Sequence, residues 1–246
     1  MSKRVNEGKN ESMSERVNDG TRERMSQGPN ERREGAGGSL VDPLARCLVG
    51  SFSTHWGVFL DRDGTVTEEV GYVNHPSRLN LLPGAAEGIA ALNRAGVPVL
   101  LATNQAGVAR GYFTEDLVKV VLARLQSLLS AQGARLDGMY YCPHHPSVGP
   151  PPYRQACDCR KPRPGMLERG AKDFGLDLTR CYVVGDKIGD VTFAHSVGAK
   201  GILVLTGYGL GEHTYQRQDW REPPDFIAED LVQAADWILS DAGARP

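Results

Sequence analysis

Two aspartates that stand two residues apart, Asp61 and Asp63, end the apolar run in GVFLDRDGT and are followed at once by a glycine turn. Alternate side chains of an extended segment project to the same side, so we expect both carboxylates to converge while Arg62 points elsewhere. Close carboxylates repel unless a cation or a shared proton holds them, and a hard ion such as Mg²⁺ suits this role. The first hypothesis is a metal-dependent phosphoryl site, but a solvated turn after an ordinary strand explains this short string equally well, so the residues elsewhere in the chain must decide.

Four more polar residues stand where a parallel sheet would gather them. Thr103 and Asn104 follow an apolar run, Asp186 follows the apolar YVVG, and Lys161 lies between a turn-rich stretch and a helical pattern. Ligands of open α/β sheets bind at the carboxyl ends of the strands, so these residues can meet Asp61 although they are far apart in the chain.

A second cluster consists of Cys142 and His144, a 12-residue loop, and then Cys157 and Cys159. Three thiols and an imidazole at this spacing match a closed tetrahedral zinc site. There are two alternatives. Core cysteines fit poorly with the polar, Pro- and Gly-rich loop between the pairs, and a disulfide is disfavoured in the reducing cytosol. His145 competes with His144 as the ligand, and spacing does not separate them. Four protein ligands leave no open position, so this zinc would be structural.

The last cysteine of the cluster directly precedes Arg160 and Lys161. Zinc at Cys159 would therefore hold a loop too polar to fold alone and would aim two cations at the aspartates. Cys181 stands apart from the cluster, and we expect it in the core.

Apolar runs alternate with helical patterns from Trp56 onward. This alternation predicts an α/β fold with a doubly wound, mostly parallel, Rossmann-like sheet and right-handed crossovers. The connections after the first strand and around the zinc loop are too short to form a separate helical domain over the site, so the site should be open. Segment 206–225 has no assigned role. We expect strands near 57–61, 97–102, 138–142, 181–185 and 201–205, and helices near 84–95, 114–131, 165–174, 188–197 and 231–239.

The helical pattern at 114–131 carries the clearest start signal, with Thr114 as N-cap and Glu115 and Asp116 in its first turn. Its apolar residues recur at helical spacing, which predicts a core-facing side. We assign to that side Leu117, Val120, Val121, Leu125, Leu128 and Leu129.

Composition restricts the class of protein. A chain of 246 residues with 40% hydrophobic residues and a net charge of −2 can bury the core of one α/β domain. Lys and Arg are evenly spread among acidic residues, which argues against nucleic acid as a partner. No apolar stretch approaches the roughly 20 residues of a membrane span, and no secretory signal is recognisable. We expect a cytoplasmic monomer.

Residues 1–38 contain a repeat with a period of 12, in which Met1, Met13 and Met25 stand in register. Apolar residues are scarce there, so we predict a disordered tail, with a weak interaction arm as the alternative. Translation from a later Met is a further open alternative. Residues 39–55 show no obvious element of their own and lead into the domain at 56–246.

Taken together, the motifs resemble those of the haloacid-dehalogenase-like phosphatases, which makes 56–246 a phosphatase domain. The four family motifs are matched by Asp61-x-Asp63-Gly64-Thr65, Thr103-Asn104, Lys161, and Gly185-Asp186 with Asp190. The chain is most similar to the branch of the D-glycero-D-manno-heptose 1,7-bisphosphate 7-phosphatases and histidinol-phosphate phosphatases, through LDRDGT, EVGYV, TNQAGVARGYFT, YYCPHH, CDCRKPRPGM and VGDKIGD. The repeat tail has no counterpart in this pattern.

By this resemblance, Asp61 is the nucleophile that forms an aspartyl phosphate, and Asp63 protonates the leaving alkoxide and later activates water. Mg²⁺ would be held by the Asp61 carboxylate, the Asp63 main-chain carbonyl and Asp186. The physical logic agrees, because Mg²⁺ and Lys161 neutralise phosphoryl oxygens and Thr103 donates a hydrogen bond to them.

The resemblance also implies a small sugar phosphate as substrate, with heptose 1,7-bisphosphate losing its 7-phosphate. Asp190 is either a partner of a residue that contacts the substrate or a solvated helix residue. The implied substrate-binding positions are Glu69, Gly71, Tyr72, Thr103, Asn104, Gln105, Arg160, Lys161 and Lys187.

Two alternatives remain at this stage. Within the enzyme class, the substrate can be histidinol phosphate, because a motif identifies chemistry more firmly than substrate. In a different class, a phospho-acceptor receiver domain also combines acidic residues, Thr and Lys on a doubly wound sheet. A receiver, however, has no D-x-D motif and no zinc loop.

Overall fold

The computed structural model describes residues 38–41 and 55–243. Within these residues, seven strands form one sheet in the order β1-β4-β3-β2-β5-β6-β7, and each neighbouring pair is parallel except β1 with β4. The predicted doubly wound, mostly parallel sheet is confirmed. The strands are β1 (Gly38–Val41), β2 (Val58–Leu60), β3 (Val99–Asn104), β4 (Gly138–Cys142), β5 (Tyr182–Gly185), β6 (Lys200–Val204) and β7 (Phe226–Ala228).

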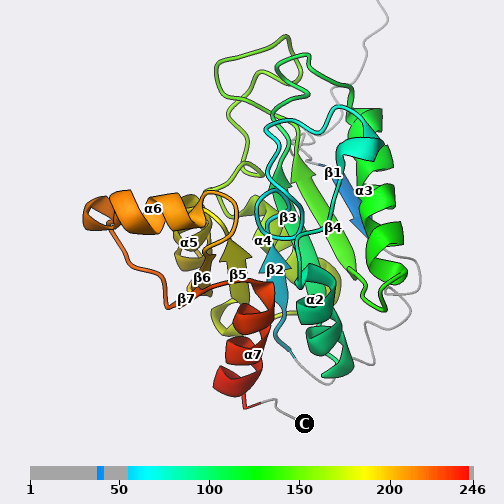
Figure 1. The fold of residues 1–246 in the computed structure, drawn as a ribbon. Coiled ribbons are helices and arrows are strands. Elements are labelled where there is room, and N and C mark those ends of the chain that lie inside the picture. Colours follow the sequence, from blue (N-terminus) through cyan, green and yellow to red (C-terminus); the bar gives the residue numbers. More distant parts are fainter. Residues whose placement is uncertain (1–37, 42–54, 244–246) are drawn as a thin grey trace, which may run out of the picture. The chain divides into compact units, whose positions relative to one another are not determined.

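Helices cover both faces of this sheet. In Figure 1, α2 and α7 lie in front of the strands, and α4 and α5 lie behind them. Among the described residues, the segment between Leu60 and Ala85 has no helix beyond the 3₁₀ turn Pro76–Arg78, and the segment between Cys142 and Gly165 has none, so no cap domain covers the carboxyl edge. The helices are α2 (Ala85–Arg94), α3 (Glu115–Ser130), α4 (Gly165–Phe174), α5 (Ile188–His195), α6 (Gly209–Tyr215) and α7 (Leu231–Asp241).

The central strands are continuous buried runs, VFL in β2 and VLLAT in β3, because a parallel sheet is covered on both faces. Helix α3 begins as predicted, with the Thr114 hydroxyl accepting a hydrogen bond from Leu117 N at 3.3 Å. One assignment to its core face is wrong, since Val120 is 52% exposed. The buried stripe instead runs through Val118 and Leu122, four residues apart, and Val120 lies between them on the far side of the turn.

One expectation for a connecting segment is wrong, and a second segment, which had no assigned role, contains short elements. The lead-in was expected to carry no element, but β1 pairs antiparallel with β4, with Gly38 opposite Tyr141. Segment 206–225 contains α6 and the 3₁₀ turn Arg217–Asp219, and the three-residue strand β7 follows it. Elements this short carry too few residues for periodicity to reveal them. The predicted tail before Gly38 and most of the lead-in lie outside the described residues.

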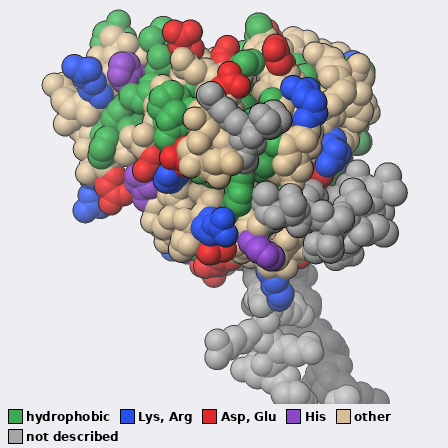
Figure 2. All heavy atoms as spheres, turned by 90° about the horizontal axis from the view of Figure 1, so that it is seen from below, with side chains coloured by type: hydrophobic (Ala, Val, Ile, Leu, Met, Phe, Trp, Pro, Cys, Tyr) green, Lys and Arg blue, Asp and Glu red, His purple; other side chains and the backbone are tan. Residues whose placement is uncertain are grey.

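Charge is evenly distributed at the end of the domain where α2 and α7 terminate. Figure 2 shows this face, on which Lys and Arg are interspersed with Asp and Glu, and neither sign forms a patch.

Among the helices of the described residues, none has the length and hydropathy needed to cross a bilayer.

Candidate active site and metal centre

The reactive residues gather at the carboxyl edge of the sheet, where the strand order reverses. Asp61 follows β2 and Asp186 follows β5, and these strands are neighbours, with Asp61 N donating to Val184 O at 2.9 Å. Thr103 lies at the end of β3, on the other side of β2. Open α/β sheets bind their ligands at this switch point, so the topology brings together the residues that the sequence separates.

A buried lysine joins two of the acidic residues. Lys161 Nζ lies 2.8 Å from Asp61 Oδ1 and 2.6 Å from Asp190 Oδ1, and the three side chains are 10% exposed or less. Burial alone raises the pKa of Asp61, but the charge and hydrogen bond of Lys161 outweigh it and hold that pKa below its usual range. Burial likewise opposes the lysine charge, yet Asp190 and Asp61 raise the pKa of Lys161. Asp190 is therefore a buried support of Lys161, and its interpretation as a solvated helix residue is wrong.

Asp63 has other partners than Asp61, and the expectation that Arg62 points away from the carboxylates is wrong. The Arg62 guanidinium does not point away but donates to both carboxylate oxygens of Asp63, with Nη2 at 2.8 and 2.7 Å and Nε at 3.0 Å from Oδ1. Strand alternation fails because β2 ends at Leu60 and the chain turns at Gly64, which has a φ of +83°. Gln105 Nε2 completes the arrangement by bridging Asp63 Oδ2 (3.3 Å) and Thr103 Oγ1 (3.0 Å).

Three carboxylates approach closely enough to hold a cation. Ligand oxygens of Asp61, Asp186 and Asp190 all lie within 4.8 Å of one another. Asp186 is fully buried, and its Oδ2 accepts a hydrogen bond from Tyr208 N at 2.9 Å. Its Oδ1 has no hydrogen-bond partner, although Lys187 Nζ lies 3.5 Å away. Burial raises the pKa of Asp186 to about 7. A buried carboxylate oxygen without a hydrogen bond beside Asp61 fits a hard cation such as Mg²⁺.

A cavity of about 280 Å³ opens above these groups. It contains the predicted substrate-binding positions except Gln105, which lies buried beneath it. Asn104 also fixes the backbone of Lys161, since its Oδ1 accepts from Lys161 N at 3.1 Å and its Nδ2 donates to Lys161 O at 3.3 Å. The lining residues are Asp61, Asp63, Glu69, Gly71, Tyr72, Thr103, Asn104, Ala106, Arg160, Lys161, Pro162, Lys187, Gly189 and Asp190.

The side chain of Lys187 lines the cavity. Its ammonium lies 3.5 Å from both Glu69 Oε2 and Asp186 Oδ1 and 4.4 Å from the centre of the Tyr208 ring. Burial opposes its charge, but Asp186 and Asp61 together raise its pKa. Sequence reasoning missed Tyr208, whose signal in the chain is the short TGYG run that follows β6.

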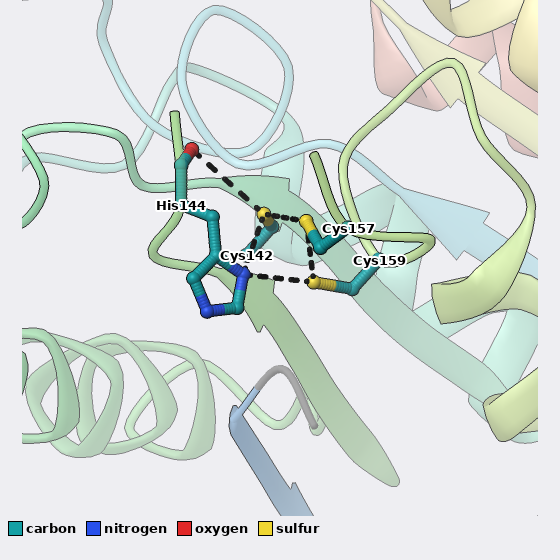
Figure 3. A group of neighbouring side chains, drawn as sticks. All are labelled: Cys142, His144, Cys157 and Cys159. Atoms are coloured by element: carbon teal, nitrogen blue, oxygen red, sulfur yellow. Dashed lines mark hydrogen bonds between the residues drawn. The ribbon is translucent and has the colours of Figure 1, made fainter. Parts of the chain in front are cut away.

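The cysteine cluster closes around one point, as Figure 3 shows. Neighbouring donor atoms lie 3.5 Å (Cys142 to Cys157), 3.2 Å (Cys157 to Cys159), 3.3 Å (Cys159 to His144 Nδ1) and 3.7 Å (His144 Nδ1 to Cys142) apart. A tetrahedron with Zn–S bonds of about 2.3 Å has edges of about 3.8 Å, close to these separations. Burial lowers the pKa of His144, which favours the neutral imidazole that binds metals. The donor set therefore fits zinc.

The structure separates the two candidate histidines. His145 turns away from the thiols, and its Nδ1 accepts hydrogen bonds from Ser147 N (3.2 Å) and Val148 N (3.1 Å). The cluster is tied to the cavity as predicted, because Arg160 Nη1 donates to His144 O at 3.1 Å and Lys161 follows at once. A metal that fixes this loop would thus also fix both cations.

The chain is similar to known phosphatases over most of its length. A family model described as HAD-hydrolase-like matches residues 158–234. A D-glycero-D-manno-heptose-1,7-bisphosphate 7-phosphatase from Thermosynechococcus vestitus is 44% identical over 194 residues, covering 76% of this chain and 97% of that protein. The D-glycero-beta-D-manno-heptose-1,7-bisphosphate 7-phosphatase of Escherichia coli K12 is 38% identical, covering 77% of this chain and 91% of that protein.

Solved structures agree with these relatives. The D,D-heptose 1,7-bisphosphate phosphatase from B. bronchiseptica, in a complex with magnesium and phosphate, superimposes with a TM-score of 0.67 at 32% identity and covers 75% of this chain and 99% of that one. The corresponding enzyme from Burkholderia thailandensis gives a TM-score of 0.55 at 29% identity, covering 74% of this chain and 97% of that one.

Proposed function

The chain belongs to the haloacid-dehalogenase-like phosphatases, and on that premise we propose that it is a Mg²⁺-dependent phosphomonoesterase that removes the 7-phosphate of D-glycero-D-manno-heptose 1,7-bisphosphate. One observation carries the chemistry: Asp61, paired with Lys161 at 2.8 Å, lies in an uncapped cavity beside Asp186 Oδ1, a buried oxygen without a hydrogen bond. The names of the relatives support the choice of substrate. Family membership excludes the receiver-domain alternative.

The side chains divide the proposed reaction into two displacements. Asp61 attacks phosphorus and forms an aspartyl phosphate, while the bond from phosphorus to the sugar oxygen breaks and Asp63 gives that oxygen its proton. Asp63 then takes a proton from water, which attacks the aspartyl phosphate and releases inorganic phosphate. Arg62 and Gln105 keep Asp63 oriented through both steps.

Lys161 holds the nucleophile ionised and offsets the charge of the incoming phosphoryl oxygens, so that an anionic carboxylate can approach them. Thr103, at the end of β3, is proposed to donate a hydrogen bond to the same oxygens. The Asp61 and Asp186 carboxylates and the Asp63 carbonyl would hold Mg²⁺, which would supply further positive charge beside the phosphoryl group.

Zinc at the cysteine cluster is proposed as structural. A cytoplasmic location belongs to the same proposal, because the cytosol keeps thiols reduced and the three cysteines of the cluster are free thiols. Arg160 is proposed to bind the second phosphate of the substrate, since guanidinium groups bind phosphate bidentately and Arg160 lines the cavity.

The test compares kcat/KM on heptose 1,7-bisphosphate and on histidinol phosphate, with and without added Mg²⁺. We expect Mg²⁺-dependent turnover with a clear preference for the bisphosphate, and Arg160→Ala should reduce that preference. A preference for histidinol phosphate would establish the alternative substrate. Full activity after removal of all divalent ions would contradict the proposed chemistry.

A further inference from the structure

Glu115, the first residue of α3, binds two tyrosines that come from different parts of the chain. Its Oε1 accepts a hydrogen bond from Tyr141 Oη at 2.9 Å, and its Oε2 accepts one from Tyr153 Oη at 3.1 Å. Tyr141 belongs to β4, whereas Tyr153 lies in the loop between Cys142 and Cys157. The carboxylate therefore joins this loop to a helix and a strand of the domain.

The position of Glu115 suits a carboxylate that accepts two hydrogen bonds. The N–H groups in the first turn of α3 carry partial positive charge, which favours a negative side chain there. Both hydrogen bonds are partly buried, and a charged acceptor makes each of them stronger than a bond between neutral groups. Tyr141 is buried in the sheet, so the loop with Tyr153 is the partner that can detach.

Tyr153 is also bonded to the backbone beside His144. Tyr153 O accepts a hydrogen bond from His145 N at 3.0 Å, and Gln155 N donates to His145 O at 3.1 Å. The centres of the Tyr153 and His144 rings lie 6.4 Å apart. Because His144 and His145 are neighbours, a contact that holds Tyr153 also limits movement of the backbone that carries the histidine of the cluster.

We propose that Glu115 is a positioning residue that keeps this loop closed through Tyr153, so that loss of the contact speeds the loss of zinc. The inference rests on the proposed function in one respect, namely that zinc occupies the cluster, and it does not depend on the substrate. The contact also protects the placement of Arg160, which lines the cavity and donates to His144 O.

The first test measures how fast each protein gives up zinc to an excess of a chromogenic chelator. Tyr153→Phe keeps the ring and removes the hydroxyl, and we expect it to release zinc about tenfold faster than the wild type, as loss of a hydrogen bond to a charged group does. Glu115→Ala should accelerate release to a similar extent. In the double variant the two effects should not add, because each single change already breaks the same contact.

Tyr182→Phe is the matched control. Tyr182 Oη donates to Asp241 Oδ2 at 2.6 Å, so this variant also loses a hydrogen bond between a tyrosine and a carboxylate, but one that joins β5 to α7. Its zinc release should stay within about twofold of the wild-type rate. Equal acceleration in Tyr182→Phe and Tyr153→Phe, or no acceleration in Tyr153→Phe, would overturn the proposal.

A second measurement follows the loop itself. Hydrogen exchange read by mass spectrometry reports on residues 143–156, in which the amides of His145 and Gln155 are hydrogen-bonded. We expect exchange of this segment about tenfold faster in Tyr153→Phe, with turnover by the zinc-loaded protein within about twofold of the wild type, because the loop still spends most of its time closed. Unchanged exchange in this segment would contradict the proposal.

The outcomes separate this inference from the proposed function. A wild-type protein that holds zinc but hydrolyses no phosphomonoester would reject the proposed activity, and the rates of zinc release and exchange would still decide the role of Glu115. A wild-type protein without zinc would reject both the zinc site and this inference. If Glu115→Ala fails to fold, Tyr153→Phe alone decides.

Discussion

Asp61 and Asp63 share a chain turn but have different partners, and this difference supports the roles proposed for them. Asp61 pairs with Lys161, whereas Asp63 is held by Arg62 and Gln105. Asp61→Asn should abolish turnover, because the attacking carboxylate is lost. Asp63→Asn should slow turnover by about 10²–10⁴-fold and still allow some phosphoenzyme to form, because only proton transfer is lost.

Rapid-quench labelling followed by peptide mapping checks this prediction. The label should be found on Asp61 in the wild-type enzyme and in Asp63→Asn. A label on Asp63 would reverse the assignment.

Between β6 and α6, a short segment contacts Asp186, the carboxylate proposed to bind Mg²⁺. Thr206 Oγ1 donates to Gly64 O at 2.6 Å, and Tyr208 N donates to Asp186 Oδ2 at 2.9 Å. Tyr208 has a φ of −82°, close to the value that proline imposes. Tyr208→Pro, which removes the N–H group, should therefore raise the Mg²⁺ concentration for half-maximal activity about tenfold, as loss of a group that orients a metal ligand does.

Tyr208→Ala is the matched control, since it removes the ring and keeps the N–H group. The Mg²⁺ dependence of Tyr208→Ala should stay near that of the wild type. Indistinguishable Mg²⁺ titrations for the two variants, at equal melting temperatures, would show that the backbone contact does not position Asp186.

The zinc loop gives a second prediction at the level of structural elements. The sheet has its own apolar core, whereas residues 143–164 form no helix or strand and are held near Cys142 by the cluster. Cys157→Ser should therefore reduce activity even in protein that remains folded, because Arg160 and Lys161 lose their fixed position.

Activity is compared with the folded fraction at a temperature below unfolding, and zinc is counted by elemental analysis. If activity and the folded fraction fall in parallel, zinc only stabilises the fold and does not position Arg160 and Lys161. An active enzyme without zinc, whose Cys142, Cys157 and Cys159 alkylate freely, would reject the metal site.

For the domain as a whole, one histidine predicts a pH dependence of stability. His195 on α5 lies 2.9 Å from both Glu222 and Asp225, which precede β7. Burial lowers the pKa of His195, but the hydrogen bonds of Asp225 and Glu222 outweigh it and raise the pKa above its usual value. A raised pKa means that this stabilisation is complete below about pH 6.5 and is lost as pH rises through the folded-state pKa.

His195→Gln should therefore lower the melting temperature by about 2–4 °C at pH 6, corresponding to no more than about 1 kcal/mol for a partly exposed pair. The difference from the wild type should shrink toward pH 9. His75→Gln is the control. In the described structure the hydrogen bonds of the His75 ring go only to Ser77, with no acidic partner, so the difference in melting temperature should not depend on pH in the same way. A constant His195→Gln difference across this range would refute the assignment.

The expected monomeric state is also a property of the whole molecule and stays a prediction. Size-exclusion chromatography with light scattering should give a mass near 26.7 kDa. A stable dimer at micromolar concentration would contradict it.

Local patterns in the sequence were sufficient for the alternation of strands and helices, the Thr114 cap, the placement of Asp61 and Asp63 at the end of a strand, and the grouping of Cys142, Cys157 and Cys159. They sufficed because each depends on residues close together in the chain: apolar periodicity, capping chemistry, and the short spacings of D-x-D and C-x-C. The gathering of Asp61, Thr103, Lys161 and Asp186 also followed from sequence, since parallel strands end at one edge of a sheet.

Tertiary structure decided what depends on contacts between distant segments. It selected His144 over His145, turned Arg62 onto Asp63 where the strand ends, and placed Tyr208 behind Asp186. It also paired β1 with β4 and brought Arg110 against His145 across two loops. No periodicity encodes these outcomes, because each is set by how separate loops pack once the sheet has formed.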